Sequence, residues 1–355
     1  MSSELWPHKV LLLYEGSNFG GDFDTSFLNG LEEHGCEVTC LSRGQPWSPP
    51  FDLVLGYGPF TLELGSILPV AKQLLDLPPA QRPIFAWWLT EGIPDPRFPT
   101  WLVNIASQLR LKADHLLANG SSSPRSHWRD LALKGHRLRI FGQLNWVRER
   151  QLLDVLAVTS ASRAEYLQKQ GFSPIVVPLG YDPIYGADMG LEREIEVAFL
   201  GNTSAPRRQR LLPNLFDELA KRGIQVVVEN NVYGEARNKF LNRSRILLNV
   251  LRAPQDFVGQ RLLLGSANKT LVISEPINDS LPFIPGQHMV VASLDELAEK
   301  VHFYLSNENK RQEIVDRAYR FVFEELTTTK MVGRILAQAR QVWASKEKSV
   351  IGSRL

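Results

Sequence analysis

Short apolar runs alternate with longer amphipathic stretches along most of the chain. Runs such as KVLLLY, near the start, have the length and composition of buried strands, and the stretches between them have the spacing of helices. For the first half, the pattern predicts strands at 9–14, 36–41, 52–55, 83–89, 116–119, 155–160 and 175–178, with helices at 24–34, 62–77 and 162–171. Alternation of this kind predicts a parallel sheet with helices on both faces.

The pattern starts again after a segment rich in Gly and Pro at 180–190. The second half has predicted strands at 195–200, 224–229, 245–250, 271–274 and 289–292, and helices at 208–222, 236–243, 260–269, 294–307, 308–325 and 328–345. Two such series indicate an α/β chain with two doubly wound, Rossmann-like domains facing each other. We place the first domain at 1–180 and the second at 191–327, and expect a flexible tail at 346–355.

Composition agrees with a folded α/β chain. The 355 residues are 44% hydrophobic and 22% charged, so a sizeable core is expected. A formal charge of +2 argues against a dedicated nucleic-acid binder. No secretion signal and no apolar stretch of membrane-spanning length are evident, which predicts a soluble, cytoplasmic protein.

Basic residues concentrate between 110 and 150, where nine Lys or Arg face only three acidic residues. A patch of this kind could attract a phosphorylated acceptor or give weak contact with an anionic membrane surface. The simpler alternative is a solvated face of helices and loops.

The loop after the first predicted strand contains the glycine pair Gly20 and Gly21, followed by Asp22. Paired glycines let backbone N–H groups approach a substrate at the carboxyl end of a strand. The loop lacks the G-x-G-x-x-G spacing, so it does not support NAD binding. These residues are candidates for the acceptor side of a cleft, although a simple strand-to-helix turn explains them equally well.

The loop after strand 195–200 has the composition of an anion site. Gly201, Asn202 and Thr203 offer backbone amides and small polar groups ahead of a helix. Arg207 and Arg208 follow at the start of that helix, where the helix dipole disfavours a cation unless an anion is present. This placement favours binding of a diphosphate.

Polar residues also follow the next two buried strands of the second half. Asn249 and Arg252 lie at the carboxyl end of one strand, where polar groups are expected to face a ligand, and Arg261 opens the following helix on the same side. We take all three as candidates for binding the donor. Glu275 comes directly after strand 271–274, and Pro276 prevents that strand from continuing. We interpret Glu275 as a carboxylate that accepts hydrogen bonds from ribose or sugar hydroxyls. An ordinary surface loop and a solvated turn carboxylate are the alternatives.

Several segments then occur in a recognisable order: the GN loop with its Arg pair, LLNVLR, QRLLLGSANKTLVISEP, and PFIPGQHMVVASLDELAEKVHFYL. This order resembles the C-terminal domain of GT-B glycosyltransferases, in particular the spore-maturation-type glycosyltransferase-like group. The resemblance implies a nucleotide-sugar donor in the second domain, an acceptor in the first, and no metal ion or other cofactor. It also implies that helix 328–345 crosses back to the first domain.

The sequence departs from the family pattern at the E-x7-E motif, whose second glutamate binds the nucleotide ribose. The two positions are Asp256 and Leu264 here. Glu275 is the candidate replacement. The HTY-like segment that usually precedes the last helix is LTTTK at 326–330.

The resemblance implies transfer of a sugar to an acceptor hydroxyl, with Arg207, Arg208 and Arg252 stabilising the diphosphate leaving group. An inverting reaction would also need a base. Glu91 is the first candidate and Asp95 the second, and both follow strand 83–89. Other acids beside the glycine pair, Asp22 and Asp24, are further possibilities, and a solvated loop acid is the simpler reading of each. Trp87 and Trp88 could stack on an acceptor, though core packing explains at least one of them.

Two other functions fit the same pattern. The first is a GT-B-shaped nucleotide-sugar-binding protein without catalysis, which the altered E-x7-E positions favour. The second is a sugar-nucleotide epimerase on the same fold, for which His288 is the residue to test. The acceptor stays open among small molecules, lipid-linked sugars and proteins.

Overall fold

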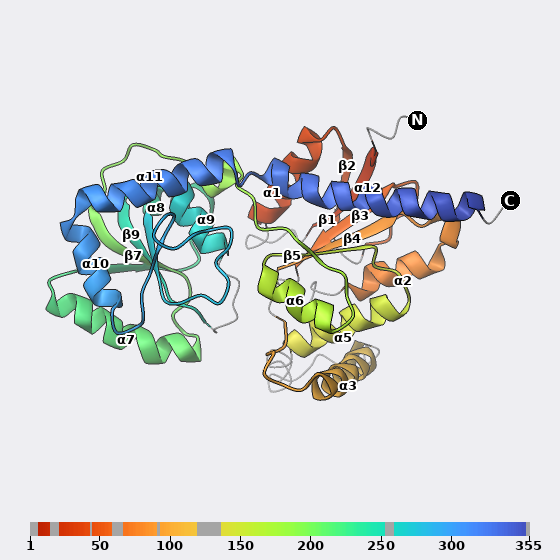
Figure 1. Ribbon diagram of the computed structural model, residues 1–355, viewed down its shortest axis with the longest axis horizontal. Coiled ribbons are helices and arrows are strands. Elements are labelled where there is room, and N and C mark those ends of the chain that lie inside the picture. Colours follow the sequence, from red (N-terminus) through yellow and green to blue (C-terminus); the bar gives the residue numbers. More distant parts are fainter. Residues whose placement is uncertain are drawn as a thin grey trace. The chain divides into compact units, whose positions relative to one another are not determined.

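The computed structural model describes residues 6–14, 21–42, 45–58, 67–90, 93–118, 136–252 and 259–352. The chain forms two compact units (Figure 1). Unit 1 comprises Met1–Asp24, Leu31–Val177 and Val332–Leu355, and unit 2 comprises Thr25–Gly30 and Pro178–Met331. Each unit contains one parallel sheet with helices packed around it, as the alternating pattern predicts.

The sheet of unit 1 has the strand order β2-β1-β3-β4-β5-β6. Its strands are β1 (Lys9–Tyr14), β2 (Glu37–Ser42), β3 (Leu53–Tyr57), β4 (Ile84–Leu89), β5 (Val155–Val158) and β6 (Ile175–Val176). All neighbours pair in parallel, and β1, β3, β4 and β5 are almost entirely buried. Strands covered on both faces need continuous apolar runs, which is why the sequence pattern located them well.

The helices of unit 1 include two that the sequence pattern missed. They are α1 (Gly21–Glu33), α2 (Leu68–Asp76), the short η1 (Pro79–Gln81), α3 (Thr100–Ala118), α5 (His136–Glu149) and α6 (Ala161–Lys169). Residues 116–119 were predicted as a strand, and that prediction is wrong because 116–118 form the last turn of α3. A short apolar run cannot by itself distinguish a strand from a helix end.

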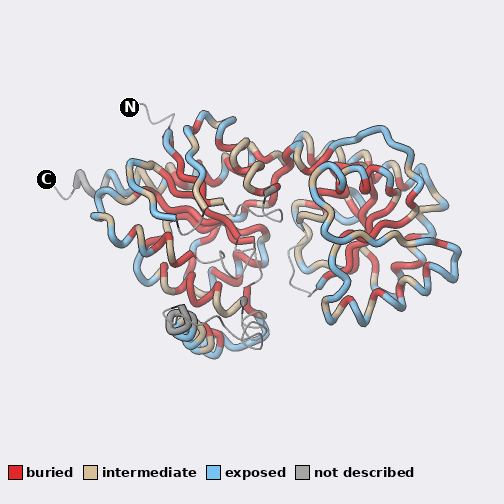
Figure 2. Tube along the Cα trace, turned by 180° about the vertical axis from the view of Figure 1, so that it is seen from behind, coloured by how far each residue is buried: buried red, intermediate tan, exposed pale blue. Residues whose placement is uncertain are grey.

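The core of unit 1 depends on a glycine in its central strand. An ideal Cβ on Gly56 would lie 2.4 Å from the indole ring of Trp87, so a larger residue cannot stand there unless the indole moves. Trp87 is almost fully buried, and its indole nitrogen donates to the Gly58 carbonyl oxygen (2.9 Å). Figure 2 shows the buried strands at the centre of each unit.

The sheet of unit 2 has the order β11-β10-β9-β7-β8. Its strands are β7 (Ile195–Leu200), β8 (Val226–Glu229), β9 (Ser244–Asn249), β10 (Leu271–Ser274) and β11 (Val290–Val291). From β7 the chain moves to one side to form β8, then returns to the other side to form β9, β10 and β11. The order therefore reverses between β7 and β9, where open α/β sheets bind ligands outside the carboxyl ends of the strands.

The helices of unit 2 lie close to their predicted places. They are η2 (Pro183–Tyr185), α7 (Pro206–Lys221), α8 (Gly234–Asn242), α9 (Gly259–Ala267), α10 (Leu297–Ser306) and α11 (Glu308–Glu324). Pro206 is the first residue of α7, a position that suits proline because it needs no N–H donor. The apolar sides of α7, α10 and α11 pack with the strands in one core cluster.

The last helix, α12 (Thr328–Gly352), continues past the predicted end at 345 into the segment expected to be a flexible tail. From Val332 onward it belongs to unit 1. There it packs closely on the unit: an ideal Cβ on Gly333 would lie 3.0 Å from the His34 ring, and Trp343 stacks on Trp6 at 4.9 Å.

Candidate functional site

Three loops meet at the carboxyl edge of the second sheet. They follow β7, β9 and β10, which are adjacent strands in the sheet. Because the strands are parallel, the residues after each strand lie at the same edge. The structure thus brings together the polar residues that the sequence predicted to surround a donor.

Gly201 is the first residue after β7, and its conformation requires glycine. Its φ is +130°, which other residues rarely adopt. An ideal Cβ at this position would lie 2.8 Å from Arg261 Nη2 and 3.7 Å from Arg208 Nη1. The guanidinium groups of Arg261 and Arg208 therefore both lie near Gly201, where the backbone carries no side chain.

Arg208 is held almost completely inside the protein, with 1% of its surface exposed. Its Nε donates to the Val250 carbonyl oxygen (2.9 Å), and its Nη1 donates to the Asn202 carbonyl oxygen (2.7 Å). The guanidinium also lies over the Phe199 ring at 5.2 Å. Two main-chain carbonyls and a ring face fix the orientation of this cation at the sheet edge.

Arg261 is fixed in a similar way. Its Nε donates to the Leu200 carbonyl oxygen (3.1 Å), and its Nη1 donates to Asn249 Oδ1 (3.0 Å). Asn249 in turn donates to Ser274 Oγ (2.9 Å) and is fully buried. Asn249 was predicted to face the ligand. The structure corrects this prediction, because the buried amide oxygen of Asn249 orients Arg261 instead.

Arg207 and Glu275 form an ion pair. Arg207 donates through Nη1 to Glu275 Oε1 (2.7 Å) and through Nη2 to Oε2, a two-point contact. Glu275 Oε1 also accepts the Leu251 N–H (2.6 Å), and Arg207 donates to the Leu251 carbonyl oxygen (2.9 Å). With 4% of its surface exposed, Glu275 is not the solvated turn acid that was the alternative. The pair ties the loops after β7, β9 and β10 together.

The remaining predicted donor residues are more exposed. Asn202 and Thr203 lie on the surface, and Asn202 Oδ1 accepts the Ser204 N–H (2.6 Å), which shapes the turn before α7. Arg252 is exposed after β9. Leu264 is buried in α9, and Asp256 lies outside the described residues. The residue at the second E-x7-E position, Leu264, therefore packs in the hydrophobic core of unit 2.

The acceptor-side residues are only partly described. Gly20 and Glu91 lie outside the described residues, whereas Gly21 is the first residue of α1. Asp22 is buried in the first turn of α1, where an acid is stabilised by the helix dipole. Trp88 is fully buried, and its indole nitrogen donates to the Val177 carbonyl oxygen (2.8 Å). The prediction that Trp88 stacks on an acceptor is thus corrected, because its ring belongs to the core.

Asp95 binds Arg97, with Oδ2 accepting from Nη2 at 2.6 Å. The hydrogen bonds from Arg97 lower the pKa of this carboxyl group, which makes Asp95 a weaker proton acceptor. Two buried hydroxyls in this unit carry no signal in the sequence pattern: Thr90, directly after β4, and Tyr166 on α6. Neither hydroxyl has a hydrogen-bond partner within the described part of the chain. Burial, with Asp95 nearby, raises the pKa of Tyr166 to about 12.

Comparison with known proteins gives a family match and a fold. Residues 192–337 match the model of the family described as "Glycosyl transferase-like". No curated protein matches the chain by sequence. Among solved structures, AviGT4, a glycosyltransferase involved in avilamycin A biosynthesis, aligns with a TM-score of 0.58 and 14% identity over 96% of this chain and 99% of its own. The chain has the GT-B fold.

Two other solved structures align with slightly lower scores. HepE from Anabaena, solved in complex with UDP-glucose, has a TM-score of 0.55 and 13% identity over 92% of this chain and 98% of its own. TarM from S. aureus has a TM-score of 0.56 and 10% identity over 81% of this chain. The chain spans only about half of TarM, 54% of its length.

His288 precedes β11, so it lies at the amino edge of the unit 2 sheet, away from the carboxyl edge. Its ring stacks on Phe321 at 4.3 Å, and its Nδ1 accepts the Ile284 N–H (3.2 Å). Burial lowers the pKa of His288. These contacts give the side chain a packing role, and they offer no support for its use in an epimerase.

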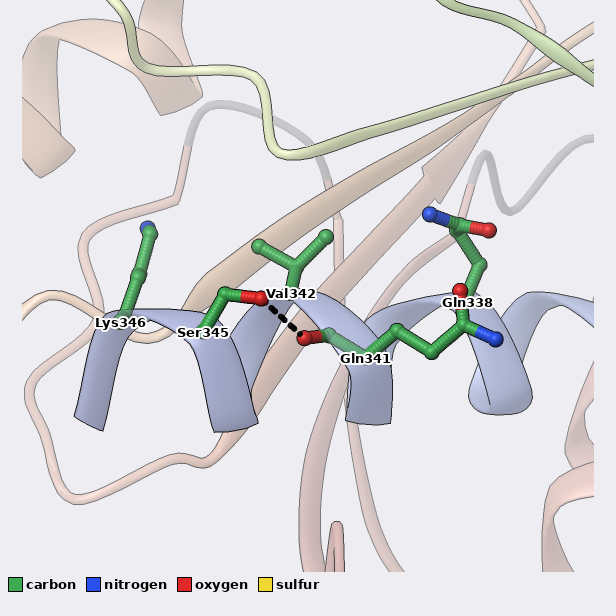
Figure 3. Close-up of a pocket in the computed structure, with 5 residues that line it drawn as sticks. All are labelled: Gln338, Gln341, Val342, Ser345 and Lys346. Carbon is green, nitrogen blue, oxygen red and sulfur yellow. Dashed lines mark hydrogen bonds between the residues drawn. The ribbon is translucent and has the colours of Figure 1, made fainter. Parts of the chain in front are cut away.

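A shallow hollow of about 410 Å³ lies along one side of α12 and is lined by Gln338, Gln341, Val342, Ser345 and Lys346 (Figure 3). Lys346 Nζ pairs with Asp154 Oδ1 (2.6 Å), and Asp154 also accepts the Phe85 N–H (3.0 Å). Asp154 precedes β5, so the hollow adjoins the amino edge of its sheet, opposite the edge where doubly wound folds bind ligands.

Within the described ranges, no helix has an apolar stretch of membrane-spanning length. Among the same residues, no group of three or more His, Cys, Asp and Glu side chains is placed to hold a metal ion.

Proposed function

We propose that the chain is a glycosyltransferase that binds a nucleotide-sugar donor at the carboxyl edge between β7 and β9. The observation that carries the proposal is the pair of fixed guanidinium groups, Arg208 and Arg261, converging beside bare backbone at Gly201. A diphosphate is the part of a nucleotide sugar that matches two adjacent cations beside a backbone position without a side chain.

The same arrangement suits the chemistry of sugar transfer. The bond between the sugar's anomeric carbon and the diphosphate oxygen breaks, and the electron pair stays on the diphosphate. The acceptor hydroxyl oxygen bonds to that carbon and gives up its proton. Arg208 and Arg261 stabilise the charge that develops on the leaving group, and we propose that they do so without a metal ion.

The base that takes the acceptor proton would come from unit 1. We keep Glu91 as the first candidate and Asp95 as the second, because both follow β4 in the sequence. The lowered pKa of Asp95 makes it the poorer base.

The neighbours' ligands indicate which donor to try first. HepE was solved with UDP, with UDP and glucose, and with UDP-glucose. UDP and UDP-glucose are therefore the first probes for this chain, followed by other nucleotide sugars.

The direct test is calorimetric titration of UDP into the wild type and Arg208→Ala. The variant should bind about 1.5–3 kcal/mol more weakly, the usual strength of a charge-assisted hydrogen bond. Arg222→Ala is the matched control, since Arg222 is exposed at the far end of α7. Equal affinity in a folded Arg208→Ala variant would place the diphosphate elsewhere.

Turnover is tested by incubating the protein with nucleotide sugars and candidate acceptors and measuring release of the nucleoside diphosphate. Binding without hydrolysis or transfer would favour the non-catalytic binding protein. Activity lost in His288→Ala with UDP affinity intact would favour the epimerase.

A further inference from the structure

The carboxyl edge of the unit 1 sheet contains a buried hydroxyl without a partner. Thr90 directly follows β4 and has 1% of its surface exposed. Within the described part of the chain, its Oγ1 makes no hydrogen bond. Leaving a buried hydroxyl unsatisfied costs free energy, so such a group in a folded protein calls for a ligand, a water or an ion that completes it.

The neighbouring strand brings a buried arginine to the same place. β4 and β5 pair in parallel, and their last pair is Leu89 with Val158. Thr90 and Thr159 follow that pair directly, so both lie at the carboxyl edge. Thr159 is also buried, and its Oγ1 accepts a hydrogen bond from Nη1 of Arg163, which is only 6% exposed. Two buried hydroxyls and a buried guanidinium therefore gather where β4 and β5 end.

Helix α6 begins at this point. Its N-cap residue, Ser160, has an extended backbone, and the serine side chain makes no capping hydrogen bond. The first turn of α6 contains no acid, and its third residue is Arg163. The helix dipole disfavours a cation in the first turn unless an anion is bound there. The start of α6 thus shares with the start of α7 an arginine in its first turn and an N-cap side chain that does not cap.

Acidic side chains nearby have partners of their own. Asp95 binds Arg97, and Glu165 on α6 binds Lys169 at the exposed surface. Glu91, which follows β4, lies outside the described residues. A test of this edge must therefore separate the carboxylate of Glu91 from an anion that binds from solution.

We propose that Thr90, Ser160 and Arg163 form a subsite for an oxyanion carried by the acceptor, either a phosphate or a carboxylate. The two hydroxyls and the guanidinium donate hydrogen bonds to the oxygens of the anion, and the dipole at the start of α6 stabilises its charge. The anion site follows from unit 1 alone, whereas its assignment to the acceptor rests on the proposed function. The acceptor is accordingly a phosphorylated or acidic molecule.

The first test is calorimetric titration of inorganic phosphate, and separately of acetate, at constant ionic strength. We expect the wild type to bind at least one of the two anions. The titrations are repeated in Arg208→Ala, which should keep this binding because the subsite belongs to unit 1. Thr90→Val should weaken the binding about fivefold, and Arg163→Gln at least about tenfold.

Thr90→Val also separates a binding role from a structural one. Valine has the shape of threonine without the hydroxyl, so the variant loses an unsatisfied buried group. Its thermal midpoint should rise by about 2–4 °C while its affinity for the anion falls. A lower midpoint would assign the hydroxyl to the fold instead and overturn the proposal.

Matched controls are available in the same unit. Thr39→Val removes a hydroxyl that is exposed on β2, and Arg150→Gln removes a guanidinium that is exposed just after α5. Both variants should bind phosphate and acetate like the wild type. Equal binding by the wild type, Thr90→Val and Arg163→Gln overturns the subsite, and so does the absence of any binding. Binding that appears only in Glu91→Gln would show that this carboxylate occupies the position, and also overturns it.

Transfer assays then assign the anion to the acceptor. With a set of candidate acceptors, an anionic acceptor should have a KM at least about tenfold below that of its neutral counterpart. This advantage should shrink in Thr90→Val. Neutral acceptors that are used equally well would overturn the assignment to the acceptor. Anion binding that depends on Thr90, without transfer to any acceptor, would instead count against the proposed function and leave the subsite in place.

Discussion

The carboxyl edges of the two sheets carry side chains of different chemistry. In unit 2 the edge carries Arg208 and Arg261, each fixed by main-chain carbonyls. In unit 1 the neighbouring strands β3 and β4 have Tyr57 as the last residue and Trp88 as the next-to-last residue, and both side chains are fully buried. The same sheet architecture thus fixes two arginine side chains at the edge in unit 2 and buries two aromatic side chains at the edge in unit 1.

Glycine is used differently at the two edges. A Cβ at Gly201 would meet a guanidinium nitrogen of Arg261 at 2.8 Å, whereas a Cβ at Gly56 would meet ring carbons of Trp87 at 2.4 Å. One glycine thus admits charged groups to the backbone, and the other admits an apolar ring to the core. Substitutions at the two edges should therefore separate binding from stability.

The largest effect is expected at Gly56. Gly56→Ala places a methyl group 2.4 Å from the Trp87 ring in the middle of the first sheet. Overpacking of this kind should lower the free energy of unfolding by about 3 kcal/mol, measured by urea denaturation. The affinity for UDP in the folded fraction should stay unchanged. A variant as stable as the wild type would show that the indole moves aside easily.

A smaller loss of stability is expected when the ion pair in unit 2 is removed. Glu275→Gln keeps the size of the side chain but takes the counter-charge from Arg207, and should cost about 2 kcal/mol of unfolding free energy. The control is Glu218→Gln, whose partner Lys221 is also exposed on α7, so that solvent screens the pair and the unfolding free energy should stay close to that of the wild type. Weaker binding of UDP-glucose with unchanged stability would assign Glu275 to the donor instead.

Gly201→Ala should weaken UDP binding about tenfold, about 1.4 kcal/mol. The added methyl group meets Arg261 Nη2 and forces an unfavourable φ. Gly223→Ala is the control: its φ is +76°, but nothing lies within 4 Å of its Cβ. The difference between the two variants isolates the contact with the arginine. Equal UDP affinity in both would remove Gly201 from the site.

The smallest effect is a pH dependence from His288. Burial lowers the pKa of this imidazole below its value of about 6.5 in the unfolded chain. Above that pH the ring is neutral in both states. As the pH falls below it, the unfolded chain binds the proton first, so unfolding becomes easier. Urea midpoints should fall across this range in the wild type and fall less in His288→Gln. Parallel profiles would contradict the assignment.

Much of the fold of unit 2 was predictable because buried parallel strands appear in the sequence as continuous apolar runs. Strand β10 was predicted at its observed bounds, and β9 within a residue. Helix α3 was missed because apolar residues on both its sides obscure the single-sided helical pattern.

The candidate site was predictable as a set of loops but not as a set of contacts. Loop position followed from strand order, so Arg208 and Arg261 could be placed at one edge. Sequence spacing carries no information on which side chains turn inward. The pairing of Arg207 with Glu275 and the burial of Asn249 therefore required the structure.

The carbonyl oxygens that hold Arg208 and Arg261 have a consequence for how fast and at what entropic cost a ligand binds. A flexible arginine loses rotamer freedom when it grips an anion, about 2 kcal/mol at full immobilisation. Here that freedom is already lost when the chain folds, since main-chain carbonyls of the protein itself anchor both side chains. An anion should therefore meet a formed cradle, with an association rate set by diffusion and charge and not by slow rearrangement of the arginines.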